Sequence, residues 1–190
     1  MPLPWYIHNI FTITGKMSSE WRLYMGKLYV RVDDRLIHGQ IVTAWCQTLG
    51  IEQIIAVDDE LANNPMLQSI MTMGVPAHYN PKIVTIENAR ALLQQEYDNT
   101  LLVIVRFCKT LGSMRDEIKN AENINLGNSS KIPESVFQLA RGVGWYIYLS
   151  QADAELLNLL VEEDGATVFS QQMPQEKLLN WPDMKKELGL

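Results

Sequence analysis

Short apolar runs alternate along the chain with longer segments in which apolar and polar positions recur at helical spacing. The runs have the length and the β-branched content of buried strands. They predict strands at 27–32, 52–57, 82–86, 100–107, 123–127, 144–149 and 166–173. The intervening segments predict helices at 39–49, 64–74, 87–97, around 113–122, at 151–165 and at 175–188, the last broken near Pro182. The polar, irregular stretch 128–144 is predicted to be a long loop.

This alternation predicts an α/β fold, with a single domain built on an open, mostly parallel sheet that has helices on both faces. The chain has 190 residues and shows no internal repeat, linker or low-complexity tract, so one domain is expected over 25–190. Residues 1–24 lack the periodicity of the rest. We interpret them as an appended N-terminal arm, disordered or produced by a mis-assigned start.

The composition excludes some classes of protein. The 16 basic and 22 acidic residues give a net charge of −6, which disfavours nonspecific binding to nucleic acid. The longest apolar run, around 101–105, is far shorter than the roughly 20 residues of a membrane-spanning helix. Cys46 and Cys108 form no CxxC pair, so we expect buried structural thiols in a reducing cytoplasm.

The most informative segment is RVDDRLIHGQ at 31–40, where a predicted strand turns into a helix. Ligands of open parallel sheets bind beyond the carboxyl ends of the strands, and a helix start offers free amides to an anion. His38 lies in this turn, flanked by Arg31 and Arg35. Nearby cations disfavour the protonated imidazole, and guanidinium groups suit phosphoryl oxygens. The segment predicts a phosphoryl-handling site with His38 as the candidate nucleophile.

Other residues of the turn have candidate supporting roles. Asp33 or Asp34 could accept the N–H of the second ring nitrogen and fix the tautomer, although capping or pairing with arginine explains them equally well. The amides of Gly39 and Gln40, at the helix start, are candidate phosphate ligands. Arg31 alternates with apolar positions on the strand, so a structural ion pair is its alternative role.

Polar residues also follow other predicted strands, whose carboxyl ends the fold brings to one edge. Asp59 follows the second strand, Lys109 and Thr110 follow the fourth, and Asn125 and Gly127 lie in the fifth. We expect these residues to border the crevice that contains His38. For Lys109 and Thr110, a solvated strand end is an equally good interpretation.

A metal site is the main chemical alternative. His8, His38 and His78 lie far apart, and the chain has neither HxxxH nor CxxC spacing. The motifs GxGxxG, GxxxxGK[ST] and GxSxG are also absent. We therefore expect no metal and no nucleotide cofactor. A histidine that only satisfies a loop hydrogen bond remains the structural alternative.

The stretch RVDDRLIHGQIVTAW resembles the active-site segment of the IIB components of the mannose/fructose/sorbose family of the bacterial phosphoenolpyruvate-dependent sugar phosphotransferase system. In that family a strand ends in R-[VI]-D-x-R-[LI]-[IL]-H-G-Q, and the histidine is phosphorylated. The segments VDDELANNPMLQSIM, 108–110 and 125–128 also look like family positions, and the similarity runs from about Lys27 to the end. The chain departs from the family pattern at 129–131, where Ser-Ser-Lys replaces a stretch with Met-His.

The resemblance implies a phosphohistidine carrier with transferase activity. The IIA component would phosphorylate His38, and the membrane components IIC and IID would present a sugar whose hydroxyl accepts the group. Arg31 and Arg35 would stabilise the phosphate, and Asp33, at the acidic position of the motif, would orient the histidine. We expect a cytoplasmic protein that associates peripherally with the membrane complex, and a homo-oligomer is left open. A regulatory or degenerate relative that binds partners or phosphate without transfer to sugar is the alternative.

Overall fold

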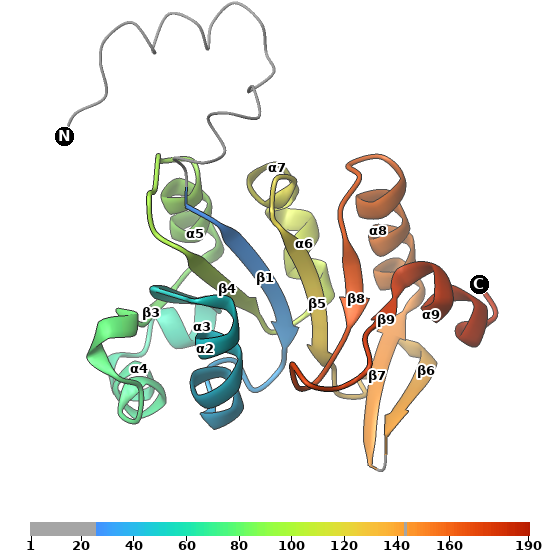
Figure 1. The fold of residues 1–190 in the computed structure, drawn as a ribbon, viewed down its shortest axis with the longest axis horizontal. Helices are drawn as coiled ribbons and strands as arrows, with labels where there is room; N and C mark the ends of the chain where they lie inside the picture. Colours follow the sequence, from blue (N-terminus) through green and yellow to red (C-terminus); the bar gives the residue numbers. More distant parts are fainter. Residues whose placement is uncertain (1–25, 143) are drawn as a thin grey trace, which may run out of the picture.

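A seven-stranded sheet forms the centre of the fold (Figure 1). The computed structural model describes residues 26–142 and 144–190. The strand order is β3-β2-β4-β1-β5-β8-β9, and every pair is parallel except β8 with β9. The strands are β1 (Leu28–Asp33), β2 (Gln53–Val57), β3 (Lys82–Val84), β4 (Leu101–Val105), β5 (Asn123–Asn128), β8 (Val168–Ser170) and β9 (Leu179–Asn180).

Helices connect these strands, and five of the ten described helical segments begin at a residue whose side chain accepts a hydrogen bond from the first turn. Asn64, for example, accepts from the Leu67 amide, and Ser150 and Asp153 form a reciprocal capping box. The helical segments are η2 (Ile41–Trp45), α2 (Cys46–Leu49), α3 (Asp59–Ala62), α4 (Pro65–Thr72), η3 (Ala77–Tyr79), α5 (Ile86–Leu93), α6 (Cys108–Ser113), α7 (Arg115–Ile118), α8 (Gln151–Glu162) and α9 (Trp181–Leu188).

The two faces of the sheet are covered by two separate hydrophobic cores. Because successive strand residues point to opposite faces, Ile55 and Val57 pack in the core with α8, whereas Ile54 and Ala56 pack with Trp45. Residues of β4, all buried, divide between the two cores in the same way. The predicted fold, an open and mostly parallel sheet with helices on both faces, is confirmed.

The prediction of a long loop over 128–144 was wrong for its second half. Strand β6 (Ser135–Gly142) pairs antiparallel with β7 (Trp145–Ser150) in a hairpin. On β6, Val136, Gln138 and Ala140 are exposed while Leu139 is buried. Side chains therefore alternate between the two faces of the strand, and one of these faces is exposed to water. The hairpin lies beside the edge toward which the arrowheads of β1 and β5 point (Figure 1).

Two helix predictions also need correction. The terminal helix begins at Trp181 and contains Pro182 in its first turn, where a missing amide costs no hydrogen bond, so the proline starts the helix and does not break it. The predicted helix around 113–122 begins and ends too late: the structure has two short helices there, α6 and α7, which span Cys108–Ser113 and Arg115–Ile118 and meet at Met114. The interpretation of residues 1–24 lies outside the described residues.

Both cysteines are buried and free, and burial raises the pKa of the Cys46 thiol to about 12. Within the described residues, no helix combines the length and the apolar character needed to cross a bilayer.

Candidate functional site

Asp33 is the centre of the polar cluster at the carboxyl end of β1. Its carboxylate is buried, and three side chains converge on it: Arg31, Arg35 and His38. The Oδ2 atom lies 3.0 Å from Nε2 of His38 and accepts from Nη2 of Arg31 at 3.0 Å. The Oδ1 atom accepts from Nε of Arg35 at 3.1 Å. One carboxylate therefore fixes the positions of all three cationic or ionisable side chains.

The charge state of Asp33 follows from this arrangement. Burial acts to raise the pKa of Asp33, but the hydrogen bonds with His38 and Arg35 and the charge of Arg31 outweigh it and hold the pKa at about 2. An ionised carboxylate only accepts hydrogen bonds, so Nε2 of His38 must be the protonated ring nitrogen. In the neutral imidazole the lone pair is then on Nδ1. Within the described residues, Nδ1 makes no hydrogen bond.

His38 is held at the start of a helix by an unusual turn. Leu36 has a φ of 55° and is fully buried, so an apolar side chain anchors a left-handed backbone in the turn. The carbonyl of His38 accepts from the amides of Ile41 and Val42 at 2.9 and 3.3 Å, which begins the helix. The His38 side chain is 16% exposed, so its ring is enclosed but reachable from solvent.

The amides of Gly39 and Gln40 occupy the first helical positions after His38. Neither donates to another described residue, as expected for the first turn of a helix. The helix continues through the short π-helix η2 into α2 and ends at Gly50, whose φ is 63°. The two predicted phosphate-binding amides are thus adjacent to the histidine and unoccupied by protein acceptors in the described part of the chain.

The two arginines differ in exposure. The side chain of Arg31 is 1% exposed, whereas that of Arg35 is 41% exposed. Arg31 donates to the carbonyls of Gln171 and Gln172 as well as to Asp33. Burial lowers the pKa of Arg31, and the charge of Asp33 opposes this effect. Arg31 therefore acts on the site through Asp33, while its direct contact with phosphate stays a prediction.

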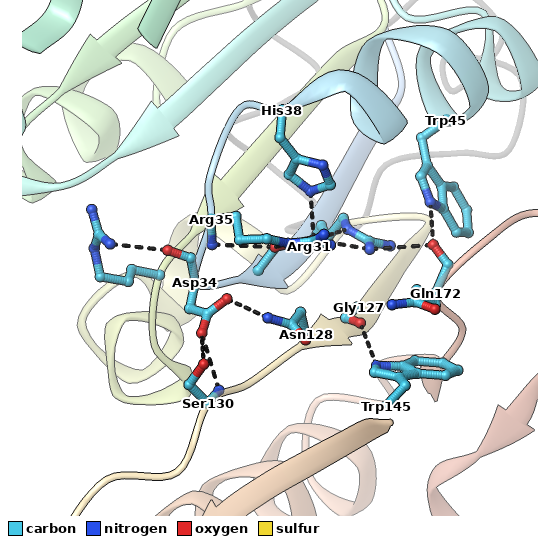
Figure 2. Close-up of polar contacts among 12 residues, drawn as sticks. Arg31, Asp34, Arg35, His38, Trp45, Gly127, Asn128, Ser130, Trp145 and Gln172 are labelled. Atoms are coloured by element: carbon cyan, nitrogen blue, oxygen red, sulfur yellow. Dashed lines mark hydrogen bonds and ion pairs between the residues drawn. The ribbon is translucent and has the colours of Figure 1, made fainter. Parts of the chain in front are cut away.

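Trp45 and Gln172 complete the surroundings of Arg31, and they were not among the predicted site residues. The Arg31 guanidinium lies over the Trp45 ring, 5.0 Å from its centroid. The Trp45 indole N–H donates to the Gln172 carbonyl at 2.9 Å, the same oxygen that Arg31 contacts (Figure 2). Trp45 follows His38 by seven residues, a spacing that favours one shared helix face, but no sequence signal marks a backbone carbonyl.

Of the predicted crevice residues, Gly127 and Asn125 lie against this cluster. A Cβ on Gly127 would overlap the guanidinium of Arg31, so only glycine leaves room for it. The Gly127 carbonyl accepts from the Trp145 indole at 3.1 Å. Asn125 is buried and accepts from the Gln171 amide at 3.1 Å, which holds the segment that Arg31 contacts.

The other predicted crevice residues are placed differently. Asp59 accepts from the Ile86 amide at 2.8 Å and so caps α5; β4 separates its strand from β1. Thr110 is buried within α6, and Lys109 is exposed near the Phe107 ring. Within the described residues, neither contacts the His38 cluster through a hydrogen bond or ion pair. No group of three His, Cys, Asp or Glu side chains there is arranged to hold a metal ion.

The fold and this cluster define an α/β protein with a histidine, a carboxylate and two arginines at the carboxyl edge of its sheet. The protein-family model described as "PTS system sorbose subfamily IIB component" matches residues 27–189 of the sequence. The chain therefore belongs to this family of phosphotransferase components of sugar transport.

Individual relatives agree with this assignment. A probable phosphotransferase enzyme IIB component of Streptococcus pyogenes is 27% identical over 147 residues, which are 76% of this chain and 90% of the relative. The sorbose-specific EIIB component of Klebsiella pneumoniae is 28% identical over 142 residues, or 74% and 86% of the two chains. The crystal structure of manxB from Thermoanaerobacter tengcongensis has the same fold, with a TM-score of 0.73 at 23% identity, and covers 86% of this chain and 98% of that one.

Proposed function

We propose that the chain is a phosphohistidine carrier, which accepts a phosphoryl group on Nδ1 of His38 and passes it to a sugar hydroxyl. The contact between Nε2 of His38 and Oδ2 of Asp33, 3.0 Å long, carries this proposal. It assigns the proton to Nε2 and leaves the Nδ1 lone pair for phosphorus. Membership in the IIB family of the phosphotransferase system supports the same role.

The transfer consists of two displacements at phosphorus. In the first, Nδ1 attacks the phosphoryl group of a phosphorylated donor protein; an N–P bond forms on His38 and the donor's bond to phosphorus breaks. In the second, a sugar hydroxyl oxygen attacks, the N–P bond breaks and the hydroxyl proton is released. Asp33 stabilises the positive charge that the imidazole gains on phosphorylation, because Nε2 keeps its proton and its contact with the carboxylate.

The protein supplies positioning and charge more than covalent chemistry. Arg35 binds the same carboxylate as His38 and its side chain is 41% exposed, so it is the candidate that turns from Asp33 toward phosphoryl oxygens. The amides of Gly39 and Gln40 are candidate partners for a further oxygen. One half-exposed arginine and two amides stabilise the group without binding it so tightly that transfer stops.

The partners follow from the place of a IIB component in the relay. A IIA component is the proposed donor, and the IIC and IID membrane components are proposed to present the sugar. A carrier working between them acts in the cytoplasm, where it meets the membrane complex peripherally. The names of the relatives support a sugar substrate class, and the proposal does not depend on which sugar it is.

Intact-mass measurement after incubation with phosphoenolpyruvate and the upstream carriers, the IIA component included, tests the proposal. The wild-type chain should gain one phosphoryl group, and His38→Ala should gain none while its circular dichroism spectrum is unchanged. His78→Ala is the matched control, since His78 is exposed on η3, where its ring lies beside that of Tyr79. Phosphorylation that survives in His38→Ala would overturn the assignment. Reversible phosphate binding without a gain in mass would favour a binding protein.

A further inference from the structure

Asp34 follows Asp33 directly, yet its side chain belongs to a different set of contacts. Its carboxylate points toward Asn128 and Ser130 and away from His38 (Figure 2). It accepts hydrogen bonds from the Asn128 side chain, from the Ser130 hydroxyl and, at 3.2 Å, from the Ser130 amide. Two adjacent carboxylates thus serve two purposes, since Asp33 organises the histidine and Asp34 binds the segment that follows β5.

The segment Asn128–Ser130 is in turn joined to the β6–β7 hairpin. Ser129 pairs with β7 in parallel at Ile147, and its carbonyl accepts from the Tyr148 amide at 3.1 Å. Its hydroxyl donates to the Tyr148 carbonyl at 2.6 Å. Asp34 therefore holds Ser130, and the adjacent Ser129 is hydrogen-bonded to a hairpin at the same edge of the sheet as His38.

The backbone of Asp34 is held independently of its side chain. Its carbonyl accepts from Nη1 of Arg106 at 2.9 Å, and Nε of Arg106 donates to Asp58 at 2.6 Å. Arg106 thereby fixes the His38 turn against the ends of β2 and β4. Because of this second anchor, loss of the Asp34 side chain should free the segment Asn128–Ser130 and leave the turn in place.

We propose that Asp34 is a positioning residue that fixes the segment Asn128–Ser130, and with it the β6–β7 hairpin, beside His38 so that a protein partner can approach the histidine. The inference rests on the proposed function for its kinetic readout. Asp34 affects how the phosphoryl donor binds. Arg106 affects the geometry of the His38 turn and hence the chemical step.

Phosphorylation kinetics separate these two effects. With the phosphorylated IIA component as donor, Asp34→Ala should raise KM about tenfold, the loss expected for hydrogen bonds to a charged group, while kcat stays within about a factor of two. Arg106→Met should instead lower kcat. With phosphoramidate, a small donor that needs no docking surface, Asp34→Ala should react at the wild-type rate.

Hydrogen exchange gives a readout that does not depend on activity. In Asp34→Ala the amides of Ser130 and Tyr148 should exchange faster, whereas the β1 amides should keep their wild-type protection. Asp34→Asn retains one carboxamide oxygen as acceptor and should restore part of the KM. Ser130→Ala is the milder second variant, which removes one donor without changing the turn. The matched control is Asp164→Asn, because Asp164 forms an ion pair with Arg115 on the other side of the domain.

Each outcome has a definite meaning. A wild-type chain that takes up no phosphoryl group contradicts the proposed function, whereas the exchange experiment still tests the role of Asp34. If the wild type is phosphorylated but Asp34→Ala lowers kcat at unchanged KM, or slows the phosphoramidate reaction, Asp34 acts on the turn and the inference is wrong. Unchanged exchange at Ser130 and Tyr148 overturns it as well.

Discussion

Nε2 of His38 lies 3.0 Å from Oδ2 of Asp33, and the same oxygen accepts a hydrogen bond from the buried Arg31. This relationship couples the stability of the domain to the chemistry of the site, because one buried carboxylate is needed for both. It also distinguishes the two ring nitrogens of the histidine.

Replacement of Asp33 should impair phosphorylation more than any other change that leaves the histidine in place. Asp33→Asn keeps the shape of the side chain but removes its negative charge. That charge stabilises the phosphoimidazole and fixes the Nε2–H tautomer of His38. We expect the rate of phosphorylation to fall by about 10²-fold or more. Single-turnover kinetics with the IIA donor will measure this. A rate near that of the wild type would show that Asp33 does not orient His38.

The low pKa of Asp33 predicts a pH dependence of stability. Its pKa is about 2 in the folded chain, against an ordinary value of 3.8, so its ionised form stabilises the fold. This contribution is fully present above about pH 4 and is lost as the pH falls through 2; it amounts to about 2 kcal/mol. Urea unfolding at a series of pH values will measure it. Asp33→Asn should show a correspondingly flatter profile over this range, and equal slopes for the two proteins would contradict the assignment.

The two arginines should respond differently to the same substitution. Arg31→Gln breaks a buried ion pair and should lower the free energy of unfolding by about 3–5 kcal/mol. Arg35→Gln removes a half-exposed partner and should cost less than about 1 kcal/mol, but should slow phosphorylation by about 10–100-fold. Denaturant unfolding and single-turnover rates, measured on both variants, will show whether the roles separate. Equal destabilisation by the two changes would contradict the proposed division.

Gly127 should be sensitive to even a single added methyl group. In Gly127→Ala the new Cβ would overlap the Arg31 guanidinium, which is itself held by Asp33 and two carbonyls and cannot move freely. We expect a loss of about 2 kcal/mol or more in the free energy of unfolding, together with slower phosphorylation. Gly74→Ala is the control, because its Cβ would lie more than 4 Å from the nearest heavy atom of the described residues outside the glycine's own neighbours. Identical melting temperatures for the two variants would contradict the packing argument.

Much of the site was predictable because strand ends and motif residues coincide in the sequence. The run RVDDRLIHGQ placed His38 at a strand-to-helix turn, and the parallel sheet placed that turn at the carboxyl edge. The choice of Asp33 over Asp34 as the residue beside the histidine came from the family motif, and the structure shows the contact with Asp33. Alternation alone could not separate the two, since both adjoin the turn.

Other features were not predictable for physical reasons. Asp59 follows a strand as Asp33 does, but the strand order inserts β4 between β2 and β1 and sends Asp59 to the start of α5. Strand β6 was missed because most of its side chains are exposed or only partly buried. The sequence there lacks the run of buried apolar residues that marks the strands of the main sheet. The burial of Arg31 depends on Gly127 and on the carbonyls of Gln171 and Gln172, which lie about 100 to 140 residues away in the chain. Such contacts form only in the tertiary fold, so a local sequence pattern does not predict them.

The central claim is that His38 carries the phosphoryl group on Nδ1 while Nε2 keeps its proton and its contact with Asp33. Nuclear magnetic resonance of the phosphorylated chain, labelled with ¹⁵N in histidine, tests it most directly through the coupling between phosphorus and the ring nitrogens. We predict coupling to Nδ1 of His38 and a proton retained on Nε2. Phosphorus bonded to Nε2, or a phosphoryl group on any other residue, would contradict it.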